Sequence, residues 1–105
     1  MKKPTRLTVT ARILPDGQPF SVFGRDAWAL LELHNAGASG CTPIDHPGPR
    51  WSAYVFKLKR LHNLTIQTVN EAHKGQFAGT HGRYILHSRI EILERNDVAE
   101  LARAA

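Results

Sequence analysis

Residues 40–63, with the sequence GCTPIDHPGPRWSAYVFKLKRLHN, form the stretch that determines the fold. Its first part predicts a short helix over residues 42–46, because Thr42 is a good helix cap and Pro43 suits the first helical position. The Pro-Gly-Pro sequence at 47–49 ends that helix within about a turn. Two helices that meet at a sharp corner are typical of a helix-turn-helix.

The second helix, expected over residues 49–62, has two different faces. Apolar side chains recur at helical spacing on one face: Trp51, Tyr54, Val55, Leu58 and Leu61. The other side carries Ala53, Phe56 and Arg60, flanked by Arg50, Lys57 and Lys59, and nothing acidic occurs up to Asn63. A solvated helix face usually mixes charges, so this surplus favours a polyanionic partner. Cations near a helix C-terminus also complement its dipole, which explains Lys59 and Arg60 but not Arg50.

Composition sets the class of protein. The chain has 105 residues, of which 42% are hydrophobic, so we expect one domain over 1–105, with its core at about 20–92 and a short segment at 93–105. Cys41 is the only cysteine, which excludes an internal disulfide and a multi-cysteine zinc site. No signal-peptide pattern and no apolar run of membrane-spanning length occurs, so a cytoplasmic location is expected.

The rest of the chain predicts an α+β order of elements. The expected strands cover 7–13, 18–23, 64–71 and 82–92, with a turn at 15–17, a helix at 25–36 ending at Gly37, and a glycine-rich hairpin loop at 72–82. Val69 breaks the alternation of its strand and predicts a bulge or an early divergence of the two strands. Residues 94–105 could form a short terminal helix. The expected core comprises Trp28, Leu31, Ile44, Val55, Leu58, Leu61 and Leu86.

The positive charge is concentrated in the second helix and the hairpin. The net charge is +5, yet residues 50–89 contain seven Lys or Arg residues against the single acid Glu71, a local net charge of +6. Such clustering is the electrostatic footprint of nucleic-acid binding.

Four segments carry a resemblance to a known family: GRDAW at 24–28, CTPID at 41–45, PGPRWSAYV at 47–55 and GTHGRY at 79–84. Together they resemble small winged helix-turn-helix proteins of bacteria and their prophages, over about residues 20–88. The resemblance implies a three-helix core with an N-terminal strand and a C-terminal β-hairpin wing. It also implies double-stranded DNA binding, either sequence-specific or architectural, in the manner of a phage-related transcription regulator.

The resemblance further implies where DNA would be met. The helix after Pro49 would enter the major groove, where Arg50, Ser52, Lys57 and Arg60 would contact phosphates or base edges. The hairpin would be the wing, with Lys74 and Arg83 on phosphate and His73 and His81 assisting when protonated. Phe56 has two interpretations: it stacks on a sugar or a thymine methyl, or it packs beneath the wing or the first strand.

Other chemistry finds little support. The six histidines include no His-x-x-x-His pair, so no metal and no cofactor is expected. Cys41 precedes a helix, where a thiol pKa can be lowered, but no histidine–carboxylate pair is indicated beside it, so we expect a partly buried side chain and no enzyme. The alternative to a DNA reader is a winged helix that binds protein. Both a monomer and a homodimer are compatible with the sequence.

Overall fold

The computed structural model describes residues 7–48, 50–73 and 79–96. In chain order the elements are strands β1 (Thr8–Ile13) and β2 (Phe20–Phe23), helix α1 (Gly24–Ala36), the 3₁₀ turn η1 (Gly37–Ser39), helix α2 (Trp51–His62), and strands β3 (Ile66–His73), β4 (Gly79–Leu86) and β5 (Ile90–Asn96). The α+β class is therefore confirmed.

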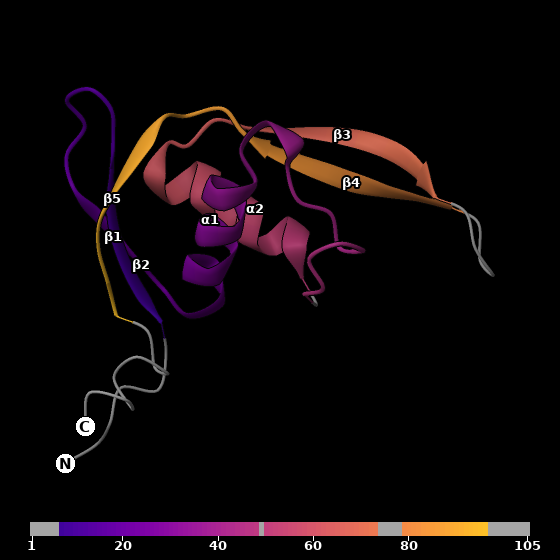
Figure 1. The fold of residues 1–105 in the computed structure, drawn as a ribbon, viewed down its shortest axis with the longest axis horizontal. Helices are drawn as coiled ribbons and strands as arrows, with labels where there is room; N and C mark the ends of the chain where they lie inside the picture. Colours follow the sequence, from indigo (N-terminus) through magenta and orange to yellow (C-terminus); the bar gives the residue numbers. More distant parts are fainter. Residues whose placement is uncertain (1–6, 49, 74–78, 97–105) are drawn as a thin grey trace, which may run out of the picture.

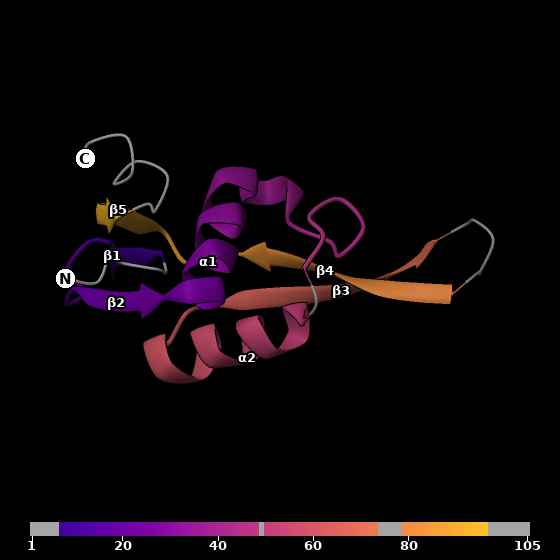
Figure 2. The ribbon, with the colours of Figure 1, turned by 90° about the horizontal axis from the view of Figure 1, so that it is seen from below.

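The strands form two separate antiparallel sheets. One has the order β2-β1-β5, so the strand that ends the described chain pairs with the first one; the other is the two-stranded hairpin β3-β4. Figure 1 shows α1 and α2 beside the three-stranded sheet, while the far end of the β3-β4 hairpin projects beyond both helices. Seen from below in Figure 2, α2 runs alongside the first part of β3.

Both helices end at the residues that the sequence predicts, Ala36 and His62. Gly37 follows α1 with a φ of 58°, and its N–H donates to the Leu33 carbonyl. Asn63 ends α2 in the left-handed conformation, and its N–H donates to the Lys59 carbonyl over 3.1 Å. A residue with positive φ turns the chain away from the helix axis while still satisfying a terminal carbonyl. This turn leads α2 directly into the hairpin.

The core lies where the three-stranded sheet and the two helices meet. Its most deeply buried apolar side chains come from β1, α1 and α2: Val9, Ala11, Leu30, Leu33 and Leu58. An aromatic cluster extends this core toward the hairpin, with ring centroids 5.3 Å apart for Trp28 and Trp51 and 5.8 Å apart for Trp51 and Tyr84. Trp51 is the first residue of α2, so this packing fixes the start of the helix.

The predicted helix at 42–46 is wrong: only a single capped turn forms. The Thr42 hydroxyl accepts a hydrogen bond from the Asp45 N–H, and the Thr42 carbonyl accepts one from the His46 N–H. The predicted cap at Thr42 is therefore present. Pro47 disfavours helical backbone at the residue before it, so the turn ends there. The structure describes two α-helices, not the three-helix core that was expected.

The second helix and the last strands also differ from prediction. Helix α2 begins at Trp51 and not at position 49, which lies outside the described residues. The strand expected over 82–92 is split into β4 and β5, which belong to different sheets. The break lies where the chain is hydrogen-bonded to Thr65. The Ser88 Oγ accepts a hydrogen bond from the Thr65 N–H, and the Thr65 carbonyl accepts one from the His87 N–H.

The hairpin is more regular than expected. The pairing of β3 with β4 is unbroken from Ile66 to His73, so no bulge occurs at Val69. The irregularity lies instead between Thr10 and Ala11, where β1 pairs with β5. Strand β3 ends at His73 and β4 starts at Gly79, which confines the loop to 74–78, inside the predicted 72–82 and outside the described residues.

The predicted core is correct in part. Leu31, Val55 and Leu58 are buried, and Trp28 and Leu86 are partly buried against the core. Ile44 and Leu61 are 55% and 67% exposed, so both predictions were wrong. Ile44 lies in the turn that forms no helix, and Leu61 lies on the flank of α2. The helix expected over 94–105 is also wrong at its start, because 94–96 belong to β5; 97–105 lie outside the described residues.

Candidate nucleic-acid interface

Helix α2 presents a basic outer surface. Its inner side chains are buried in the core, and its exposed cations are Arg50 at the N-cap position, Lys57, Lys59 and Arg60. The helix contains no Asp or Glu. Since like charges three or four residues apart repel each other, this arrangement costs some helix stability that a mixed surface would not. A bound anion would remove that cost.

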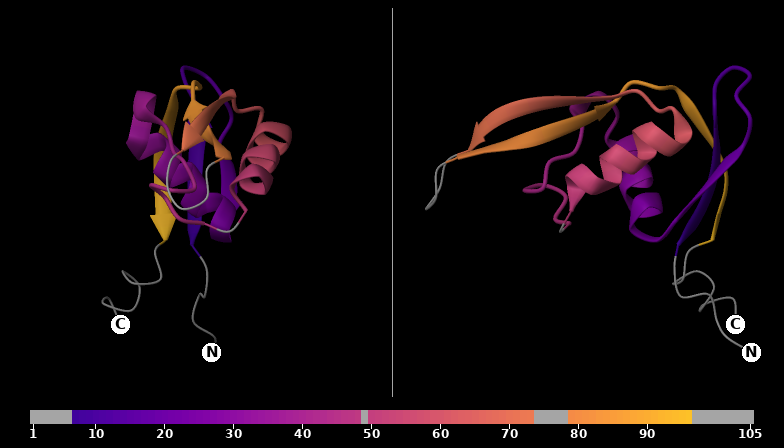
Figure 3. Two further views of the ribbon diagram at one scale, coloured as in Figure 1. Left: turned by 90° about the vertical axis from the view of Figure 1, so that its right-hand side faces the viewer. Right: turned by 180° about the vertical axis from the view of Figure 1, so that it is seen from behind.

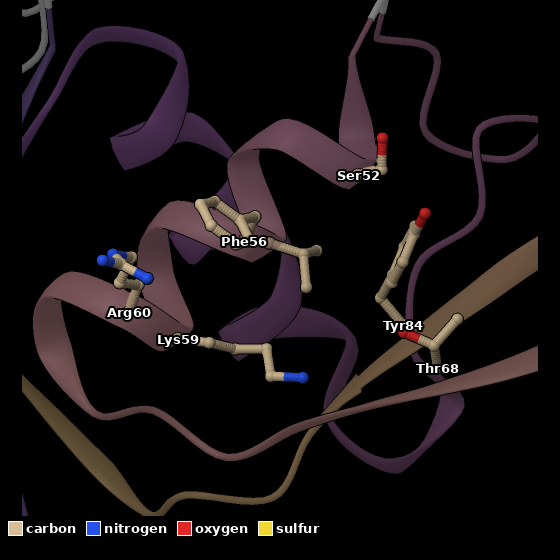
Figure 4. A pocket seen from close by; sticks show the side chains of 7 residues that line it. Ser52, Phe56, Lys59, Arg60, Thr68 and Tyr84 are labelled. Carbon is tan, nitrogen blue, oxygen red and sulfur yellow. The ribbon is translucent and has the colours of Figure 1, made fainter.

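A groove separates this surface from the hairpin. It has a volume of about 470 Å³, and one wall is built by Ser52, Phe56, Lys59 and Arg60 of α2. Thr68 of β3 and Tyr84 of β4 form the other wall, and Val55 closes the floor. Figure 4 shows the Lys59 side chain extending across the groove toward the strands. Helix and hairpin therefore line the same groove, which a ligand could contact from both sides at once.

The hairpin is tied firmly to the start of α2. Cys41 and Tyr84 exchange two backbone hydrogen bonds of 2.8 Å, and the Tyr84 ring stacks on Trp51 at an angle of 16° between the ring planes. Gly40 permits this approach, because a Cβ atom there would lie 2.6 Å from the Tyr84 carbonyl oxygen. The direction in which the hairpin projects, visible from behind in Figure 3, is set by these contacts.

A charged cluster joins the two strands of the hairpin between their middle and the loop end. The Arg83 guanidinium donates to Glu71 through Nε at 2.5 Å and through Nη2 at 3.2 Å, and its Nη1 donates to the Ser39 carbonyl at 2.7 Å. The hydrogen bond from Arg83 lowers the pKa of the Glu71 carboxyl, and His81, whose Nε2 lies 3.2 Å from Glu71 Oε1, lowers it further. Three of the five N–H donors of Arg83 thus serve the protein itself.

The structure separates the predicted contact residues into groups. Ser52 and Arg60 line the groove, and Arg50 is exposed at the N-cap position of the same helix. Lys57 lies toward α1, where its ammonium is 3.8 Å from an Asp26 carboxylate oxygen. Arg83 belongs to the charged cluster that joins the hairpin strands, and Lys74 lies outside the described residues, as does the side chain of His73.

Lys59 lines the groove but was not among the predicted contact residues, although Arg60, whose charge the helix dipole explains equally well, was. Its spacing could have revealed it: Lys59 lies seven residues after Ser52, which places both side chains on one side of a helix. Thr68, across the groove, carried no signal in the sequence, since its position depends on how the hairpin folds back along α2.

Phe56 is 60% exposed, so it is not packed beneath the hairpin or the first strand. Its ring lines the groove and lies 5.9 Å from the Arg60 guanidinium carbon, a distance at which a cation is attracted to an aromatic face. Of the two interpretations of this residue, the one in which its ring is available to a ligand agrees with the structure.

Other sites are not supported by the part of the chain that the structure describes. The Cys41 side chain is fully buried, and this burial together with the nearby Glu32 raises the pKa of its thiol to about 11, so the thiol is neutral and is not activated. Within residues 7–48, 50–73 and 79–96, no three His, Cys, Asp or Glu side chains come together as metal ligands. No helix among them has the length and apolar character needed to cross a bilayer.

Comparison with known families agrees with this geometry. The family model described as "Winged helix domain" matches residues 19–96, a span that includes α1, α2 and both strands of the hairpin. No curated protein and no solved structure gives a significant match to the chain. Winged helix domains are generally DNA-binding modules and typically have no enzymatic activity. With about three quarters of its length matched, the chain belongs to the winged helix domain family.

Proposed function

We propose that this protein binds double-stranded DNA, with α2 in the major groove and the β3-β4 hairpin against the flanking backbone. It acts as a transcription regulator of a bacterium or its prophage, in the cytoplasm. The family supports DNA as the class of partner, and the proposal extends this to the surface that makes the contact.

One observation carries the proposal: α2 and its N-cap expose four cations and the helix itself contains no acid, with Lys57 lying 3.8 Å from Asp26 of α1. The hairpin that lies beside these cations is tied to the start of the helix. Phosphates supply most of the affinity in protein–DNA complexes, and Arg and Lys are their usual ligands. Arg50, at the start of the helix, is placed for a phosphate. Ser52, Lys59 and Arg60, which line the groove, are placed for base edges or for the adjacent backbone.

The remaining predicted residues have secondary roles in this proposal. Lys74 would meet phosphate from the hairpin loop. Lys57 would add to the field from the α1 side, partly offset by Asp26. Arg83 would act mainly by holding the hairpin in place, with two N–H donors left over for the backbone.

The test is fluorescence anisotropy with random duplexes across a salt series. Each neutralised phosphate adds about 0.9 to the slope of log affinity against log salt, so roughly four contacts predict a slope near −4 per protomer. Lys74→Ala should lower the affinity for all sequences alike and reduce the slope by about one. Absence of binding at about 50 mM salt, or binding that ignores salt, would contradict the proposal and favour a protein-binding winged helix.

The preferred sequence is obtained by selecting tight binders from a random duplex pool. A homodimer would select two half-sites related by a two-fold axis, about one helical turn apart, whereas a monomer would select a single short site. The selected duplex also provides the probe for the inference that follows.

A further inference from the structure

Phe56 is an unusual residue for the middle of a basic surface. It is the most exposed aromatic side chain of α2, in a helix whose other aromatic residues, Trp51 and Tyr54, are buried in the core. Leaving a large apolar ring in water forfeits the stabilisation that burial provides. A ligand that covers the ring would recover it.

The ring is held in place by its neighbours. Ser52 and Arg60 lie one turn before and one turn after it, and the Arg60 guanidinium carbon is 5.9 Å from the ring centroid. Figure 4 shows the ring on the wall of the groove, with Thr68 and Tyr84 on the opposite wall. The groove thus combines an apolar patch with flanking positive charge.

Charge identifies what this patch is built to cover. Phe and Arg are enriched at protein–protein interfaces but Lys is depleted there, and a helix that carries Lys59 and Arg60 with no acidic residue favours a polyanion over a protein surface of mixed charge. The same pattern suits a duplex, where phosphates lie on both sides of a groove that exposes base edges. The occupant that fits is therefore the major groove of DNA.

We propose that Phe56 is a specificity-determining residue that reads the 5-methyl group of a thymine. This inference rests on the proposed DNA binding. Among the base edges exposed in the major groove, the thymine methyl is the apolar group, and the other groups are hydrogen-bond donors or acceptors. A phenyl ring offers no hydrogen bond, so contact with that methyl is the sequence-dependent interaction open to it.

The experiment replaces thymines of the selected duplex by deoxyuridine, one at a time. This removes a single methyl and leaves the hydrogen-bonding groups unchanged. At one thymine the wild-type protein should lose about fourfold in affinity, the factor expected from burial of one methyl group. Phe56→Ala should bind the thymine and deoxyuridine duplexes equally, while Phe56→Leu, which stays apolar, should keep most of the preference.

Leu61→Ala is the matched control, because Leu61 is an equally exposed apolar residue of the same helix that does not line the groove. It should retain the wild-type ratio. If wild-type protein binds the duplex but discriminates at no thymine, the inference is overturned and the proposed function stands. Discrimination that survives in Phe56→Ala would overturn the assignment to Phe56. If the wild-type protein binds no duplex at all, the proposed function itself is overturned.

Discussion

Helix α2 and the β3-β4 hairpin are both basic in sequence, but they present their charge differently. The cations of α2 face solvent on a helix without a single acid. In the hairpin, Arg83 is bound to Glu71 and to the Ser39 carbonyl. The number of cations in the sequence therefore overstates how many the hairpin has available to bind an anion. For α2 the number in the sequence is close to the number available.

The difference comes from how each element brings residues together. In a helix, neighbours are three or four residues apart, so a stretch without acids makes a surface without acids. In an antiparallel pair, residues distant in sequence face each other: Glu71 lies opposite His81 and diagonal to Arg83. One carboxylate can then neutralise cations from the other strand. The acidic partner decides which cations remain available.

The largest expected effect comes from the inner face that holds α2 in position. Leu58 is fully buried, so Leu58→Ala should lower the free energy of unfolding by about 2–5 kcal/mol, through lost burial and a cavity. Leu61→Ala, three residues further and 67% exposed, should stay within about 0.5 kcal/mol. Urea denaturation measures both. Equal losses would show that α2 is not seated as described.

A smaller effect should follow at the attachment of the hairpin. Gly40 has φ 71° and ψ −178°, a conformation that is essentially restricted to glycine, at a cost of about 1–3 kcal/mol for other residues. In Gly40→Ala the new Cβ would also meet the Tyr84 carbonyl, whereas Gly37→Ala, with φ 58° and nothing within 4 Å, carries only the backbone cost. Denaturant melts should therefore rank Gly40→Ala as the more destabilised. The reverse order would contradict the contact with Tyr84.

Local signals in the sequence predicted much of the fold. Gly37 and the alternation within residues 7–13 are signals that depend on neighbours along the chain, and the helix and strand that they define are present. The helix expected at 42–46 failed for a local reason, Pro47, whereas the division of the last strands depends on partners distant in sequence. The division between β4 and β5 depends on the hydrogen bonds of Thr65 with the His87 N–H and the Ser88 hydroxyl. The periodicity of residues 82–92 could not reveal these bonds.

The candidate site shows the same limit. The basic outer surface of α2 could be predicted from helical spacing, and so could the position of Ser52 and Arg60 along the same side of the helix. Arg83 could not be assigned, because its engagement with Glu71 depends on the register of a hairpin whose pairing was predicted with a bulge at Val69. Lys57 was placed on the polar side correctly, yet its proximity to Asp26 depends on the packing of α1 against α2.

Two lysines of α2 provide a matched pair for the DNA surface. Lys59 lines the groove, whereas Lys57, two residues earlier and also exposed, faces Asp26. Lys59→Ala should reduce the salt slope by about 0.9, so its affinity deficit should shrink roughly three- to fourfold between 50 and 200 mM salt. Lys57→Ala should change the slope less. Fluorescence anisotropy with one duplex measures the salt slope of each variant. Equal changes in slope would show that the groove side and the α1 side of α2 contribute alike to DNA binding.

The smallest effect concerns the charged cluster of the hairpin, and its pH dependence has a definite sign. Arg83 lowers the pKa of Glu71 below the usual 4.5, so the folded state binds this proton less readily than the unfolded state. The resulting stabilisation is present above pH 4.5 and is lost as the pH falls through the lowered value. The melting temperature of wild-type protein should therefore exceed that of Glu71→Gln at neutral pH, and the gap should narrow in acid. Arg83→Gln should show the same narrowing, and the double variant should show little loss beyond either single one. Additive losses at neutral pH would mean that Arg83 is not engaged by Glu71, and the hairpin would then present its charge as α2 does.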